Sequence, residues 1–172
     1  MKSIPILSII GKSGSGKTTL LENLIREMKK RGYRIGTIKH HAHPGFEIDH
    51  PGKDTWRHAQ AGSDHIVIVA PDKIASIRML EEKITIEEIA ARMNDVDIIF
   101  TDGYKSAGKP AIEVIRKNHG IELISQAEQL VAIATDGKLD TEILQFNLND
   151  YDGLVELIIE KFLHQPGKST YP

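Results

Sequence analysis

The amino-acid sequence predicts an α/β fold, in which a mostly parallel sheet lies between helical layers and carries an antiparallel hairpin or edge. Apolar segments of strand length alternate along the chain with amphipathic segments of helical period, as expected when helices cover buried parallel strands. A glycine-rich loop at residues 11–18 joins the first strand, at 4–10, to the first helix, at 17–31. With the strand at 33–39, these elements predict a right-handed βαβ unit.

The first helix has one apolar stripe, basic residues in its last turn, and Gly32 as a C-cap. A short helix is expected over residues 54–61. Strands at 64–70 and 73–80 are joined at Pro71-Asp72, too short a connection for a crossover, so they should form an antiparallel hairpin. Thr85 and Glu88 have the spacing of a capping box that opens another helix.

The second half of the chain predicts further strands and a closing helix. Apolar segments at 96–101, 111–116 and 130–134 are typical of buried strands, and 144–148 of an edge strand. A helix is expected over 150–163. Residues 1–163 should form a single nucleotide-binding domain, with residues 164–172 as a flexible tail.

The glycine-rich loop matches G-x-x-x-x-G-K-[ST], the phosphate-binding loop (P-loop) of nucleoside triphosphatases (NTPases), so a three-layer P-loop NTPase fold is predicted. Its glycines allow backbone N–H groups to surround phosphate oxygens. Lys17 should contact the β- and γ-phosphates, and the Thr18 hydroxyl should ligate Mg²⁺. The predicted phosphate-binding residues are Gly11, Lys12, Ser13, Gly14, Ser15, Gly16, Lys17, Thr18 and Thr19.

Polar residues that follow other strands should lie at the same edge of the sheet, where ligands of open α/β sheets bind. Asp102 ends an apolar run, as in a Walker B strand, and is a candidate for the Mg²⁺ shell or for positioning the attacking water. Lys39 and His40 are candidates for contact with the γ-phosphate or with a phosphate of a second ligand, and the alternative is a solvated strand end. Asp49 is a second candidate for magnesium or water.

The P-loop does not select the base. Guanine is usually recognised by a carboxylate, and Asp136 or Asp140, which follow the strand at 130–134, are the candidates. The alternative is that both serve turn formation.

Composition excludes several classes of function. The formal charge of −2 argues against a general nucleic-acid-binding protein, and the absence of cysteine excludes disulfides and thiolate metal sites. Without a signal peptide or an apolar run of membrane-spanning length, we expect a cytoplasmic protein that does not bind membranes.

Four segments, at residues 11–21, 37–41, 49–55 and 101–105, resemble the MobB family of molybdopterin-guanine dinucleotide biosynthesis. The resemblance implies a homodimeric GTP-binding adapter that uses Mg²⁺ and hydrolyses GTP slowly at most. Its partner would be a MobA-like nucleotidyltransferase that joins GMP to molybdopterin; molybdopterin itself and molybdoenzyme-maturation proteins are further candidate partners. The family often carries Glu where this chain has Asp102, and Lys12 falls where related dimeric ATPases carry a signature lysine.

Two other functions stay open. His40, His41, His43 and His50 lie close together in the sequence, and this cluster, with His40–His43 at its centre, would suit a metallochaperone-type GTPase. A small-molecule P-loop kinase is the second alternative, although no arginine-rich lid segment is visible. Whether the protein is an enzyme is left open, since only Arg57 and Arg116 are interior arginine candidates for catalysis.

Overall fold

The computed structural model describes residues 3–41 and 45–163. The chain divides into two compact units, one of residues 1–40 and 89–172 and the other of residues 41–88. The single domain predicted over residues 1–163 stays a prediction, and the predicted tail at 164–172 lies outside the described residues.

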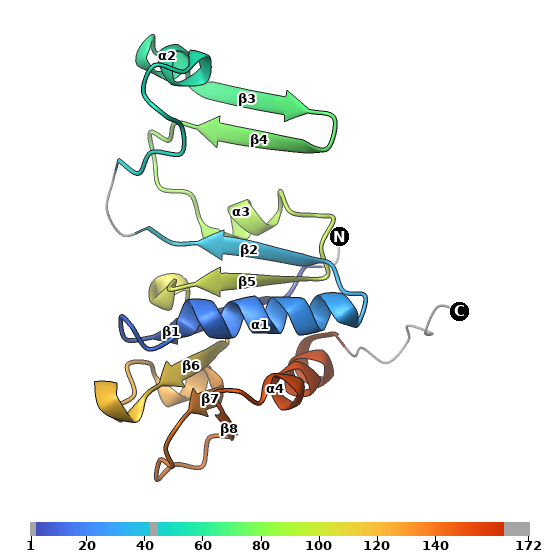
Figure 1. The fold of residues 1–172 in the computed structure, drawn as a ribbon, viewed down its shortest axis with the longest axis vertical. Helices are drawn as coiled ribbons and strands as arrows, with labels where there is room; N and C mark the ends of the chain where they lie inside the picture. The colour runs from blue at the N-terminus through green and yellow to red at the C-terminus, as the bar shows by residue number, and fades with distance from the viewer. Residues whose placement is uncertain (1–2, 42–44, 164–172) are drawn as a thin grey trace. The chain divides into compact units, whose positions relative to one another are not determined.

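The first unit is built on a sheet that has six strands in the described residues, in the order β2-β5-β1-β6-β7-β8 (Figure 1). All neighbouring strands in it are parallel. The strands are β1 (Ile6–Gly11), β2 (Ile35–Lys39), β5 (Ile98–Asp102), β6 (Ala111–Ile115), β7 (Leu130–Thr135) and β8 (Gln145–Asn147). The predicted mostly parallel α/β sheet is confirmed, and β8 lies at its edge as expected.

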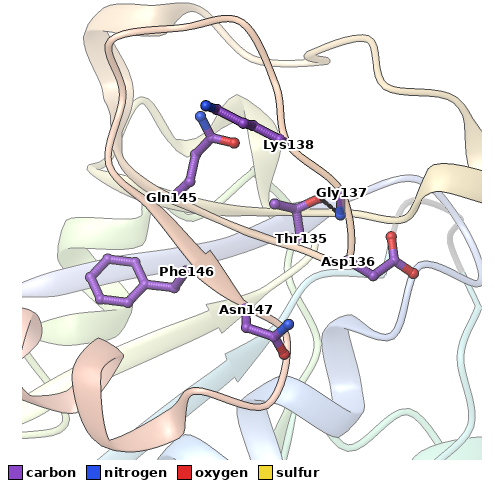
Figure 2. Close-up of a pocket in the computed structure, with 7 residues that line it drawn as sticks. All are labelled: Thr135, Asp136, Gly137, Lys138, Gln145, Phe146 and Asn147. Carbon is purple, nitrogen blue, oxygen red and sulfur yellow. Dashed lines mark hydrogen bonds between the residues drawn. The ribbon is translucent and has the colours of Figure 1, made fainter.

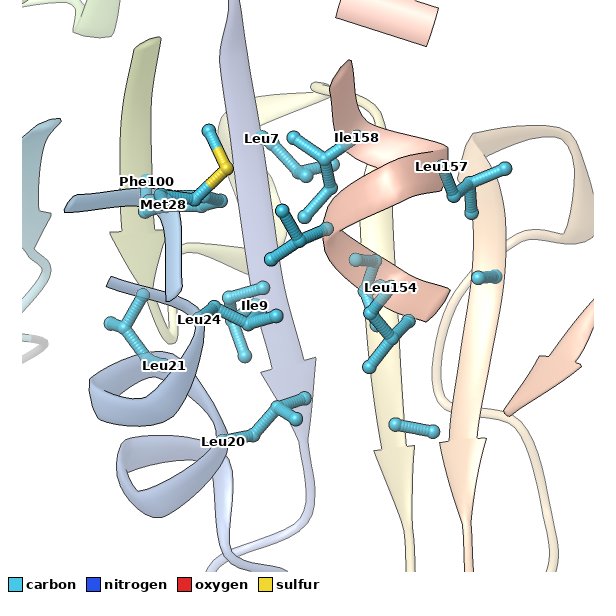
Figure 3. Close-up of a cluster of buried hydrophobic side chains, with 14 of the residues drawn as sticks. Leu7, Ile9, Leu20, Leu21, Leu24, Met28, Phe100, Leu154, Leu157 and Ile158 are labelled. Carbon is cyan, nitrogen blue, oxygen red and sulfur yellow. The ribbon is translucent and has the colours of Figure 1, made fainter. Parts of the chain in front are cut away.

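Two helices cover one face of this sheet, α1 (Lys17–Lys30) and α4 (Tyr151–Ile158). Alternate side chains of β1, β5, β6 and β7 meet both helices in the main core (Figure 3). Full burial of one such large apolar side chain stabilises the folded state by roughly 1.5–3 kcal/mol. The buried helical residues in this core are Leu20, Leu21, Leu24, Met28, Leu154, Val155, Leu157 and Ile158.

The sequence predicts one closing helix over residues 150–163, but the structure divides this segment into two helical elements. The α-helix ends at Ile158 and continues as a π-helical segment, η4 (Ile159–Leu163), and Phe162 is only partly buried. On the opposite face of the sheet, Ile115, Ile133 and Leu139 form a smaller cluster. Short turns lie between strands: η1 (Lys105–Ala107) after β5, η2 (Lys117–His119) after β6 and η3 (Ala127–Gln129) before β7.

The second unit contains α2 (Asp54–Gln60) and the hairpin of β3 (His65–Ala70) and β4 (Lys73–Arg78). The strands pair antiparallel from His65 opposite Arg78 to Ala70 opposite Lys73, so the predicted hairpin is confirmed. The predicted capping box also forms at the start of α3 (Ile86–Ala90). The Thr85 N–H donates to Glu88 at 2.8 Å, and the Glu88 N–H donates to the Thr85 hydroxyl at 3.2 Å.

Candidate functional site

The P-loop lies between β1 and α1, as predicted. Two of its glycines have backbone conformations or close contacts that disfavour a larger residue. Gly16 has φ +96° and directly precedes the first residue of α1. A Cβ on Gly11, at φ +149°, would lie 2.5 Å from the Val114 carbonyl oxygen on β6. Since no side chain caps α1, its first N–H groups remain available for an anion.

Lys17 points back onto its own loop. Its Nζ donates to the Lys12 carbonyl oxygen at 2.7 Å. Burial lowers the pKa of Lys17, and the charge of Lys39 acts in the same direction, whereas the carboxylate of Asp102 raises it. The P-loop therefore holds a partly desolvated cation close to a carboxylate, which phosphate oxygens could stabilise.

Asp102 ends β5 next to the P-loop strand and is only 9% exposed. Its Oδ2 accepts from Lys39 Nζ at 2.7 Å, because Lys39 and Asp102 are register partners on β2 and β5. Its Oδ1 is buried without a hydrogen-bond partner in the described residues. Such an oxygen suits a hard cation such as Mg²⁺, for which the exposed Thr18 hydroxyl in the first turn of α1 is a second candidate ligand.

His40 extends the same edge of the sheet. Its ring stacks on Tyr104, with ring centroids 4.3 Å apart and ring planes at 18° to each other. Its backbone N–H donates to the Asp102 carbonyl oxygen at 3.3 Å. Lys39, His40 and Asp102 are thus brought together by neighbouring strands.

A shallow pocket of about 390 Å³ opens where β7 and β8 end (Figure 2). Asp136, one predicted base reader, lines it, whereas Asp140 is exposed and not part of the lining. Gln145 fixes the connecting loop through two bonds to Leu139, one to its N–H at 2.8 Å and one to its carbonyl at 2.9 Å. The lining residues are Thr135, Asp136, Gly137, Lys138, Gln145, Phe146 and Asn147.

Sequence reasoning treated Arg116 only as a candidate catalytic arginine and missed its contact with the P-loop. Its Nε donates to the Ser15 carbonyl oxygen at 2.9 Å. Sequence reasoning also missed Glu113, which is 1% exposed on β6 and accepts the Ile124 N–H at 2.8 Å. A charged residue within an apolar strand was the available signal for Glu113.

The remaining candidates belong to the second unit. Asp49 accepts hydrogen bonds from the Thr55 hydroxyl and the His50 N–H, and these bonds, in that order, lower its pKa. Arg57 is exposed on α2. The role of Asp49 toward magnesium or water stays a prediction.

The histidine cluster lies only partly in the described chain, because His43 lies outside the described residues. Within residues 3–41 and 45–163, no group of three or more His, Cys, Asp or Glu side chains is arranged to hold a metal ion. No helix in this part of the chain is long and apolar enough to span a membrane.

A glycine-rich loop between a parallel strand and a helix, with a carboxylate at the end of the adjacent strand, defines the P-loop NTPase fold. Residues 6–136 match the family model of MobB, molybdopterin guanine dinucleotide synthesis protein B. The chain belongs to the MobB family.

Relatives and solved structures agree with this family. Molybdopterin-guanine dinucleotide biosynthesis adapter proteins of Haemophilus influenzae and Escherichia coli are 32% and 31% identical to this chain, over 94% and 95% of it and 90% and 97% of their own lengths. A crystal structure of molybdopterin-guanine biosynthesis protein B is 31% identical, with a TM-score of 0.73, covering 90% of this chain and 98% of the other. Bacillus subtilis MobB, 22% identical, shares the fold with a TM-score of 0.74, covering 94% and 100%.

Proposed function

We propose that this protein is a GTP-binding adapter in the biosynthesis of molybdopterin guanine dinucleotide, which assists a partner nucleotidyltransferase. Membership of the MobB family supports this pathway. Two relatives that align over nearly their whole lengths are named as adapter proteins of it. The observation that carries nucleotide binding is the P-loop, in which Lys17 folds back onto the loop and no side chain caps the N-terminus of α1.

In this proposal the triphosphate binds the P-loop amides and Lys17, and Lys39 and His40 lie toward the γ-phosphate. Thr18 and Asp102 would hold Mg²⁺, which supplies positive charge to the phosphate oxygens. The buried, unpaired Oδ1 of Asp102 fits that role. The base would bind in the pocket between β7 and β8, which opens at the same edge of the sheet as the P-loop.

Hydrolysis in this proposal is slow at most. Arg116 already donates a hydrogen bond to the Ser15 carbonyl oxygen, and Arg57 is exposed on α2. Neither side chain is therefore positioned as a catalytic arginine. Slow turnover suits an adapter, which needs a bound state of long lifetime.

We also propose a homodimer that uses the hairpin of the second unit. Val67, Val69 and Ile74 are large apolar side chains that are exposed on one face of this hairpin. An isolated two-stranded hairpin is marginally stable in water, so a second copy of the chain would stabilise it by covering this surface.

Calorimetric titration with GTP, GDP and ATP, with and without Mg²⁺, tests the proposal. We expect GTP to bind more tightly than ATP and Mg²⁺ to strengthen binding. Lys17→Ala should abolish binding, whereas Lys29→Ala, an exposed lysine on the same helix, should leave it unchanged. Equal affinities for GTP and ATP, or retained binding by Lys17→Ala, would contradict it.

The partner is tested separately by affinity purification of the full chain with and without GTP. Recovery of a nucleotidyltransferase that acts on molybdopterin is the expected result. Recovery of a nickel-dependent enzyme instead would favour the metallochaperone alternative. A separate incubation with GTP or ATP tests the kinase alternative, which transfer of phosphate to a small molecule would favour.

A further inference from the structure

The segment that follows β6, residues 116–120, connects the P-loop to the pocket between β7 and β8. It consists of Arg116, the turn η2 and Gly120. Its position follows from the sheet order, since β6 lies between β1, which leads into the P-loop, and β7, which leads into the pocket. We call it the bridging segment.

On one side the bridging segment holds the P-loop. Arg116 Nε donates to the Ser15 carbonyl oxygen at 2.9 Å, and Lys12 Nζ donates to the His119 carbonyl oxygen at 3.1 Å. A Cβ on Gly16 would lie 3.2 Å from Arg116 Nη2, so the guanidinium lies directly against the loop. Arg116 therefore fixes the Ser15–Gly16 peptide from which α1 begins.

On the other side the bridging segment holds Asp136. The Lys117 N–H donates to Asp136 Oδ1 at 2.7 Å, and Arg116 Nη1 lies 4.0 Å from Asp136 Oδ2. Both carboxylate oxygens thus face the bridging segment. In Figure 2 this carboxylate points away from the ammonium group of Lys138, the other charged residue that lines the pocket.

We propose that Arg116 is a positioning residue for the phosphate loop, and that Asp136 acts on nucleotide binding through Arg116 instead of reading the base directly. This inference rests on the proposed function, because it assumes that phosphates bind the P-loop and the base binds the pocket. It makes the Asp136–Arg116–Ser15 chain a link between the two halves of the nucleotide site.

The exposure of each contact sets the size of the expected effects. The Arg116 and Asp136 side chains are 43% and 39% exposed and their charged atoms are 4.0 Å apart, so their ion pair is weak. The bond from Arg116 to Ser15 is partly buried and well formed. Loss of Arg116 should therefore weaken binding more than loss of the Asp136 charge.

A double-mutant cycle tests the link. GTP affinity with Mg²⁺ is measured for the wild type, Arg116→Gln, Asp136→Asn and the double variant. Asparagine retains an acceptor for the Lys117 N–H and removes only the charge. The matched control is the same cycle on Arg31 and Asp152, an exposed pair 2.9 Å apart that joins α1 to α4.

We expect Arg116→Gln to weaken GTP binding about tenfold and Asp136→Asn about threefold. The double variant should bind like Arg116→Gln alone, because Asp136 has no further effect once Arg116 is absent. The ratio of GTP to ATP affinity should be unchanged in Asp136→Asn. The Arg31 and Asp152 variants should bind as the wild type does.

Additive losses, about thirtyfold in the double variant, would overturn the link, as would a loss of GTP over ATP selectivity in Asp136→Asn. Failure of the wild type to bind GTP would instead overturn the proposed function. Thermal unfolding checks that each variant folds. If Arg116→Gln does not fold, Arg116→Met, an unbranched side chain without charge, replaces it with the same expected non-additivity.

Discussion

At the scale of single residues, Lys17 joins the structure of the P-loop to its proposed function. Its ammonium group is bonded to a carbonyl of its own loop, and burial lowers its pKa from the ordinary value of 10.5. A phosphate bound at this position would replace the carbonyl and favour the charged form. Binding would therefore raise the lowered pKa of Lys17.

The affinity for GTP should accordingly fall as pH rises. Below the lowered pKa of the free protein, Lys17 is already charged and affinity is constant with respect to this group. Between that pKa and the raised pKa of the complex, binding requires proton uptake and weakens by up to about tenfold per pH unit. Calorimetry in buffers of different ionisation enthalpy measures the protons taken up. Lys29→Ala should keep this dependence, and affinity independent of pH up to about 10 would contradict the role of Lys17.

Asp49 offers a second pH-dependent prediction. The Thr55 hydroxyl and the His50 N–H lower its pKa below the ordinary 3.8. The group therefore contributes stability above that value and loses the contribution as pH falls through its lowered pKa. Asp49→Asn should be less thermally stable than the wild type at neutral pH, and the difference should vanish in acid.

The same position tests the predicted role of Asp49 toward magnesium. If Asp49→Ala binds GTP with the wild-type dependence on Mg²⁺ and hydrolyses it at the wild-type rate, the role of Asp49 is limited to its hydrogen bond with Thr55 on α2. Thr55→Ala is the matched variant, because it removes the main hydrogen bond and leaves the carboxylate in place.

At the scale of elements, α4 shows how a local signal positions a core helix. Asp150 precedes the helix, and its Oδ1 accepts the Gly153 N–H at 3.0 Å. A Cβ on Gly153 would lie only 2.7 Å from the same carboxylate. The cap and the glycine therefore depend on each other, although glycine is normally unfavourable inside a helix.

Asp150→Ala should destabilise the fold by about 1 kcal/mol through loss of the cap. Gly153→Ala should fail to stabilise it, in spite of the higher helix propensity of alanine. Thermal or urea unfolding measures both, and Glu156→Ala, an exposed position on α4, is the control. A gain in stability of about 1 kcal/mol in Gly153→Ala would show that the cap contributes little.

At the scale of the whole molecule, the hairpin of the second unit carries the surface proposed for the homodimer. Val69 and Ile74 are direct register partners on β3 and β4 and are 73% and 70% exposed. Such a pair stabilises a hairpin locally, and it also leaves an apolar surface that the proposed homodimer would cover.

The double variant Val69→Lys/Ile74→Glu should retain its hairpin, because opposite charges face each other across the strands, but should lose the proposed homodimer. Sedimentation velocity over a range of concentrations measures the assembly. Lys73→Glu, which changes a charge at an exposed position of the same hairpin, should remain dimeric. An unchanged dimer in the double variant would exclude this surface as the interface.

The sequence alone predicted the elements of the fold with good accuracy, because periodicity, caps and turns act between residues close in the chain. The hairpin at Pro71-Asp72, the capping box at Thr85, the edge strand and the P-loop all follow from neighbours within a few positions. The sequence predicts an α-helix that ends five residues beyond Ile158, since the same apolar pattern suits the π-helical continuation from Ile159 to Leu163.

Only the tertiary structure decided which residues meet at the site. Lys39 reaches Asp102 because β2 pairs with β5, and Arg116 reaches Ser15 because β6 pairs with β1. These partners are 63 and 101 positions apart. The sequence itself determined the phosphate loop, whose chemistry is carried by eight consecutive residues. Strand order determined what surrounds it, because a strand can pair with any other that matches its pattern, and only the packed sheet selects one.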